Sequence, residues 1–210
     1  MKKIAVIGTG YVGLVSGVGL SEFGNEVTCV DIDDKKISEL KEGKIPIYEP
    51  GLKSLVSKNV NKNRLLFSSD IDSVINNSNI VFIAVGTPQG DDGRADLSAV
   101  KSTIKSIIDN LNSYKIICTK STVPVGTGEW INAKIRETHS IDTFDYVSNP
   151  EFLREGSALN DFLYPDRVVI GASSKKAFEE MREVYRPLFI NKTPVMEFSV
   201  STAEMIKYAS

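Results

Sequence analysis

The sequence predicts an α/β fold, a Rossmann-like, doubly wound, mainly parallel sheet with helices on both faces. Short apolar runs rich in β-branched residues alternate along the chain with longer segments of helical period. The strand-like runs are apolar throughout, which suits strands that are covered on both faces of a sheet. Because parallel neighbours need a crossover connection, the alternation of strands and helices favours a doubly wound sheet.

Each predicted strand is a short, mostly apolar run. In order, these strands cover residues 4–7, 26–30, 80–85, 115–119, 145–147 and 168–170, with a further short strand at 65–67. Apolar residues recur every three or four positions in each predicted helix, as in a helix with one buried face. The predicted helices cover residues 13–23, 35–41, 97–111, 129–138 and 175–185.

Composition and charge exclude several classes of function. Lys and Arg total 25 and Asp and Glu total 27, so the formal charge of −2 provides no global basic field. We therefore expect neither nucleic acid nor an anionic membrane as a partner. No apolar run approaches the roughly 18 residues of a membrane span, and the first apolar run is too short for a signal peptide. These features predict a cytoplasmic protein.

Cysteine and histidine are too scarce for most metal or thiol chemistry. The two cysteines, Cys29 and Cys118, lie inside apolar runs without metal-binding spacing, and His139 is the only histidine. We expect two reduced, buried thiols and no metal site.

The first predicted strand runs directly into Gly-Thr-Gly-Tyr-Val-Gly at residues 8–13. Gly8 permits a tight turn, Gly10 lets a pyrophosphate approach the backbone, and Gly13 lets the helix lie close to the strand. Asp31 ends the second strand, where its carboxylate can accept hydrogen bonds from ribose hydroxyls and would repel a 2′-phosphate. The motif favours NAD over NADP; the alternative is a Rossmann-like fold with an idle nucleotide site. The expected cofactor contacts here are Gly8, Gly10, Tyr11, Val12, Gly13, Asp31 and Lys36, although Lys36 also fits a solvated helix face.

Two further loops leave strand ends at the same edge of the predicted sheet. Because ligands of open α/β sheets bind beyond the carboxyl ends of the strands, both loops should line the cofactor crevice. Their hydroxyl residues and prolines also fit ordinary turns. The residues expected to line the crevice are Val85, Gly86, Thr87, Pro88, Ser121 and Thr122.

A later segment places two carboxylates four residues apart around an arginine, in Asn-Pro-Glu-Phe-Leu-Arg-Glu-Gly-Ser-Ala at residues 149–158. Four other motifs accompany it in a fixed order. They are the glycine motif at 8–13, Gly-Thr-Pro at 86–88, Lys-Ser-Thr-Val-Pro-Val-Gly at 120–126 and Ala-Glu-Met-Ile-Lys-Tyr at 203–208. Together they resemble the nucleotide-sugar 6-dehydrogenase family, most closely its members that act on UDP-glucose, over residues 1–210.

The resemblance implies an NAD-dependent oxidation of a sugar C6 alcohol to a carboxylate, in two hydride transfers with water consumed. It implies that Glu151 handles water and a proton, that Thr122 helps to hold the water, and that Lys207 stabilises an oxyanion. It also implies that Glu155 lies close to the nicotinamide half of the cofactor. The residues implied to touch the nucleotide-sugar substrate are Glu151, Phe152, Leu153, Arg154, Glu155 and Lys207.

The chain departs from the family pattern in one respect. In that family a cysteine in a Gly-Ser-Cys-Phe type motif traps the aldehyde, and no such motif occurs here. We therefore expect residues 1–200 to form an NAD-binding domain, residues 201–210 to begin a helix that connects it to a second part, and the fragment alone to be inactive. The resemblance also implies a homodimer of the longer protein. The alternatives are a GDP-mannose or UDP-N-acetyl-hexosamine 6-dehydrogenase and a non-catalytic NAD-binding module.

Overall fold

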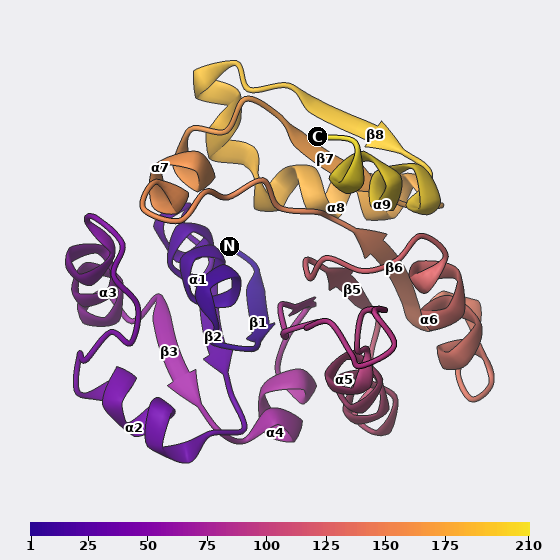
Figure 1. The fold of residues 1–210 in the computed structure, drawn as a ribbon, viewed down its shortest axis with the longest axis horizontal. Coiled ribbons are helices and arrows are strands. Elements are labelled where there is room, and N and C mark those ends of the chain that lie inside the picture. Colours follow the sequence, from indigo (N-terminus) through magenta and orange to yellow (C-terminus); the bar gives the residue numbers. More distant parts are fainter.

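A single eight-stranded sheet organises the chain, and the computed structural model describes all residues from 1 to 210 (Figure 1). The strands lie in the order β3-β2-β1-β4-β5-β6-β7-β8. Their bounds are β1 Lys3–Ile7, β2 Glu26–Val30, β3 Leu65–Ser68, β4 Ile80–Ile83, β5 Lys115–Thr119, β6 Phe144–Ser148, β7 Val168–Gly171 and β8 Val195–Phe198. This sheet confirms the predicted Rossmann-like class.

Helices cover both faces of the sheet. The helix bounds are α1 Tyr11–Glu22, α2 Asp34–Lys41, α3 Leu52–Asn61, α4 Ile71–Asn76, α5 Ser98–Asp109, α6 Thr127–Arg136, α7 Ala158–Leu163, α8 Lys175–Val184 and α9 Val200–Tyr208. Alternate residues of β1 show why both faces are apolar, since Ile4 and Val6 join one core with α1, α2, α3, α7 and α8. Ala5 and Ile7 join the second core with α4, α5, α6 and α9. None of the helices combines the length and the apolar character that a membrane span needs.

Six strands run parallel and two run the other way. β1 to β6 pair in parallel across the sheet, whereas β6 and β7 are antiparallel and share only the register pair Ser148 and Gly171. β8 then pairs with β7 in parallel. The carboxyl ends of β1 to β6 therefore meet at one edge of the sheet, which we call the carboxyl edge, and the opposite edge is the amino edge.

All seven predicted strands and all five predicted helices are present, with ends that differ by up to two residues. Sequence reasoning missed α3, α4, α7 and β8. α4 and α7 have only six residues each, too short to show a helical period, and β8 is half exposed. The helix-forming composition after Thr202 belongs to α9, which begins at Val200.

Candidate functional site

The glycine-rich turn after β1 is built for close backbone approach. Gly8 has φ of +100°, and a Cβ on it would lie 2.5 Å from the carbonyl oxygen of Ala84, the residue after β4. A Cβ on Gly13 would lie 1.9 Å from the carbonyl oxygen of Gly8, so α1 can follow β1 this tightly only with glycine there. Gly10, in contrast, faces open space.

The amino ends of α1 and α6 face the same edge but differ in what occupies them. The carboxylate of Glu204 accepts hydrogen bonds from the amides of Gly126 and Gly128 at the start of α6, both at 2.7 Å. No side chain caps Gly10, and the first turn of α1 contains no acidic residue. The amides of that turn have no acceptor within the helix, so they and the helix dipole suit an external phosphate. The turn therefore fits the pyrophosphate of a dinucleotide.

Asp31 is fixed beside the glycine turn. Its Oδ2 accepts hydrogen bonds from the amide of Thr9 at 2.9 Å, the hydroxyl of Thr9 at 2.6 Å and Nζ of Lys36 at 2.9 Å. Burial alone would raise the pKa of Asp31, but these hydrogen bonds outweigh it and lower the pKa to about 2. The carboxylate is thus ionised and held at the tip of β2, and Lys36 is its partner rather than a freely solvated lysine.

The loops after β4 and β5 are tied to each other. Ser121 Oγ donates a hydrogen bond to the carbonyl of Val85 at 2.7 Å, and Thr87 Oγ1 donates to the carbonyl of Thr122 at 2.7 Å. Gly86 and Pro88 are exposed beside them. The structure therefore brings both predicted loops together at the carboxyl edge, next to the glycine turn.

Glu151 and Lys207 form an ion pair at this edge. Lys207 Nζ lies 2.8 Å from Oε1 of Glu151 and donates a second hydrogen bond to its backbone carbonyl at 2.7 Å. The amide of Leu153 donates to Oε2 of Glu151 at 2.6 Å. The Glu151 side chain is only 10% exposed, so both charges are largely shielded from water. No hydrogen bond joins Thr122 to this pair.

Lys207 reaches Glu151 because α9 is anchored to the rest of the fold. The Glu204 carboxylate that caps α6 lies one turn before Lys207 on the same helix. Burial raises the pKa of Glu204, whereas the two amide hydrogen bonds lower it. At Gly171 a Cβ would lie 2.5 Å from that of Ala203, so α9 also lies directly on β7.

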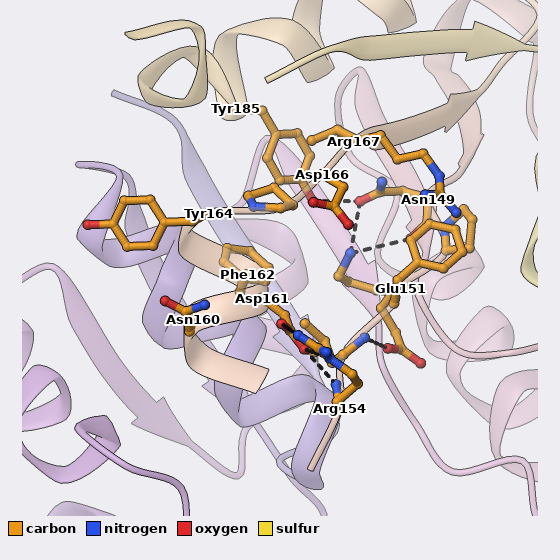
Figure 2. A pocket seen from close by; sticks show the side chains of 16 residues that line it. Asn149, Glu151, Arg154, Asn160, Asp161, Phe162, Tyr164, Asp166, Arg167 and Tyr185 are labelled. Carbon is orange, nitrogen blue, oxygen red and sulfur yellow. Dashed lines mark hydrogen bonds and ion pairs between the residues drawn. The ribbon is translucent and has the colours of Figure 1, made fainter. Parts of the chain in front are cut away.

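The segment after Glu151 borders a cavity of about 280 Å³ between α7, β7 and Tyr185 (Figure 2). Phe152 lies under two cations, with the Arg167 guanidinium 4.8 Å and Lys207 Nζ 5.6 Å from its ring centroid. Arg154 forms a bidentate pair with Asp161, at 3.0 and 2.6 Å. Glu155 is exposed. Of the predicted substrate residues, the structure thus brings Glu151, Phe152, Leu153 and Lys207 together, pairs Arg154 with Asp161 and leaves Glu155 exposed.

Sequence reasoning missed Glu49, which connects the two predicted binding regions. This carboxylate is 6% exposed and accepts hydrogen bonds from the Tyr11 hydroxyl in α1 and from the amides of Gly156 and Leu159. Burial and the contact with Glu49 raise the pKa of Tyr11. Glu49 stands between two prolines in Pro-Ile-Tyr-Glu-Pro-Gly at 46–51, and this turn-rich stretch was the only available signal.

The two cysteines are free and fully buried, as predicted. Burial raises the pKa of the Cys29 and Cys118 thiols to about 12, so neither supplies a thiolate at neutral pH.

Comparisons with known proteins agree on one family. Residues 2–189 match the family described as the UDP-glucose/GDP-mannose dehydrogenase family, NAD binding domain. A UDP-glucose 6-dehydrogenase of Bacillus subtilis is 54% identical over 100% of this chain and 45% of its own length. A UDP-glucose 6-dehydrogenase of Rhizobium meliloti is 53% identical over 99% of this chain and 48% of its own length. The solved structure of a UDP-glucose dehydrogenase from Pyrobaculum islandicum is 36% identical, with a TM-score of 0.94 over 100% of this chain and 49% of that one. The chain spans about half the length of the curated relatives it matches.

Proposed function

Because the chain belongs to the UDP-glucose/GDP-mannose dehydrogenase family, we propose that it is the NAD-binding part of an enzyme that oxidises UDP-glucose to UDP-glucuronate. The observation that carries the proposal is the shielded Glu151–Lys207 pair at the edge where the uncapped turn of α1 and Asp31 lie. The balanced reaction consumes two NAD and one water for each sugar C6 alcohol that becomes a carboxylate.

The cofactor site uses groups that the fold holds in place. The amides of the first turn of α1 bind the pyrophosphate, and Asp31 accepts hydrogen bonds from the adenosine ribose. Tyr11, Val12 and Lys36 border the same site, and the loops with Val85, Gly86, Thr87, Pro88, Ser121 and Thr122 line the rest of the crevice. Bound NAD supplies the oxidising power by accepting a hydride equivalent.

Glu151 and Lys207 handle protons and charge on the substrate side. A carboxylate within hydrogen-bond reach of water or a hydroxyl serves as a general base, which typically contributes about 10²–10⁴-fold. The Lys207 ammonium stabilises negative charge that develops on the sugar oxygen. Thr122 helps to hold the water, and Phe152, Leu153, Arg154 and Glu155 contact the nucleotide sugar, with Glu155 also near the nicotinamide.

The rest of the proposal concerns the longer protein. Residues 1–200 form its NAD-binding domain, and residues 201–210 begin a helix that leads to a part carrying the nucleophilic cysteine. The buried thiols support a cysteine elsewhere, because neither can attack an aldehyde from the core. We expect the longer protein to be a homodimer in the cytoplasm. Light scattering tests the dimer by measuring the molar mass.

The test is a stoichiometric assay of the full-length protein. With UDP-glucose and NAD, we expect two NADH and one UDP-glucuronate per substrate consumed. If NADH forms with GDP-mannose or a UDP-N-acetyl-hexosamine but not with UDP-glucose, the protein is a dehydrogenase of that other nucleotide sugar. NAD binding without turnover of any nucleotide sugar would favour a non-catalytic module.

A further inference from the structure

The sheet is weakest where Glu151 leaves it. Other neighbouring strands share four or five register pairs, whereas β6 and β7 share only Ser148 and Gly171. Glu151 follows Ser148 by three positions, so the sheet holds its segment from the β5 side, where β6 shares five register pairs, and hardly at all from the β7 side. On the β7 side, something other than strand pairing must therefore hold this segment.

Asn149 fills the opening between the two strands. Its amide donates to the carbonyl of Thr119 at 2.9 Å, and its Nδ2 donates to the carbonyl of Val169 in β7 at 2.8 Å. Its Oδ1 accepts from the Tyr185 hydroxyl at 2.6 Å and from Lys120 Nζ at 3.2 Å. Lys120 Nζ also lies 3.4 Å from the Asn149 carbonyl. Every polar group of Asn149 is thus engaged.

Lys120 is a buried cation that donates hydrogen bonds to neutral oxygens. It is 4% exposed, both partners of its Nζ belong to Asn149, and the Phe162 ring centroid lies 5.7 Å away. Burial lowers the pKa of Lys120 to about 8, against the opposing effect of the negative charge of Glu151. An apolar side chain of similar length would avoid this desolvation cost. The fold thus accepts the cost of a buried amine against Asn149, the residue two positions before the proposed general base.

We propose that Lys120 is a positioning residue, which acts through Asn149 to hold the backbone that carries Glu151 at the mouth of the substrate site. Asn149 and Pro150 connect β6 to Glu151, so a shift of the Asn149 carbonyl group also shifts the backbone of Glu151. Tyr185 contributes the second donor and joins the end of α8 to the same unit. This inference rests on the proposed function, because it assigns Glu151 a catalytic task.

Lys115 provides the matched control at the other end of β5. It is also fully buried, burial lowers its pKa as well, and its Nζ also donates to neutral oxygens, the carbonyls of Ser78 at 2.7 Å and Asn76 at 3.3 Å. The two lysines differ mainly in place, because Lys115 lies at the amino edge, away from Glu151. Any effect that both substitutions share belongs to removing a buried amine.

The experiment compares Lys120→Met, Lys115→Met and Tyr185→Phe in the full-length protein. Hydrogen exchange of the peptide spanning 150–157 reports the Leu153 amide, which donates to Glu151, whether or not the enzyme turns over. For Lys120→Met we expect exchange of that amide to rise about tenfold, equivalent to about 1.4 kcal/mol. We expect kcat to fall at least tenfold, with the NAD dissociation constant unchanged. Tyr185→Phe should show smaller changes in the same direction, and Lys115→Met should show neither.

The outcomes separate this proposal from the proposed function. Unchanged exchange at 150–157 in Lys120→Met, or an equal rise in Lys115→Met, overturns the positioning role. If exchange at 150–157 rises only in Lys120→Met, but the full-length protein oxidises no nucleotide sugar, then Lys120 does position the backbone of Glu151. In that case the proposed function fails, and Glu151 has no catalytic task. If Lys120→Met fails to fold, Tyr185→Phe carries the test, and normal exchange with normal kcat in that variant overturns the proposal.

Discussion

The two edges of the sheet differ in whether their polar groups have hydrogen-bond partners within the protein. At the amino edge, polar side chains satisfy each other and the backbone, as Asn110 does when its amide donates to Asp72 at 2.7 Å and accepts from Asn76 at 2.8 Å. At the carboxyl edge, the first turn of α1 keeps its amides without a side-chain cap. Glu151 and Lys207 form a shielded pair at that same edge. The difference shows that polar groups which bond to one another stabilise the fold, whereas backbone amides without an acceptor in the protein suit a ligand.

Substitution of Glu151 should have the largest effect. Glu151→Gln removes the carboxylate that acts as a base and should lower kcat of the full-length protein by about 10²–10⁴. The amino-edge control is Glu137→Gln, which breaks an exposed pair with Lys134 at 2.7 Å and should leave kcat unchanged. Steady-state rates with UDP-glucose measure both, and an equal loss in the two variants would contradict the division between the edges.

A methyl group at Gly13 should have the next largest effect. Gly13→Ala places a Cβ against the backbone of Gly8, so we expect the free energy of unfolding to fall by about 3 kcal/mol or more and NAD binding to be lost. At the amino edge Gly24 has φ of +93° but open space around it, and Gly24→Ala should cost only about 1–2 kcal/mol. Urea unfolding measures both, and similar costs would show that the turn can relax.

The two buried lysines should change the pH dependence of stability in the same direction, although they affect activity differently. Because the pKa of Lys120 is about 8 in the folded state and 10.5 is the ordinary value, the unfolded state binds more protons between these values. Wild-type stability should therefore rise from pH 8 to pH 10.5 by up to roughly 3 kcal/mol relative to Lys120→Met. The groups facing Lys120 are Cys118, Glu151, Lys207 and Tyr185.

Lys115→Met should flatten the same alkaline rise, since burial lowers the pKa of Lys115 too. Urea unfolding of the three proteins at pH 8, 9 and 10 gives the comparison. If neither variant changes the dependence of stability on pH, folding does not lower the pKa of either amine.

Substitution of Asp31 should have the smallest of these effects, on cofactor choice. Asp31→Ala should weaken NAD binding about tenfold, because a hydrogen bond to a charged acceptor is lost, and should weaken NADPH binding less. Asp31→Asn removes the charge but keeps the shape of the side chain. Asp33→Ala is the control, because it removes the N-terminal cap of α2 and leaves Asp31 in place. Calorimetric titration with both cofactors measures this, and equal losses for NAD and NADPH would count against the ribose assignment.

The fold and the cofactor turn could be predicted because they depend on local patterns. Apolar runs indicated the strands, and three glycines with a following acidic residue indicated the turn. The Glu151–Lys207 pair came from resemblance alone, since these residues are 56 positions apart. Glu49 and the contacts of Lys120 with Asn149 escaped prediction because burial and partner choice depend on distant parts of the chain.

Hydrogen exchange of the full-length protein with and without saturating NAD tests the central claim most directly. We expect NAD to protect the peptides that contain residues 8–13, 31–36, 85–88 and 119–122 at the carboxyl edge. Exchange at residues 77–79, 110–114 and 137–143 at the amino edge should stay unchanged. Protection confined to the amino edge, or none at either edge, would contradict the assignment of the cofactor site.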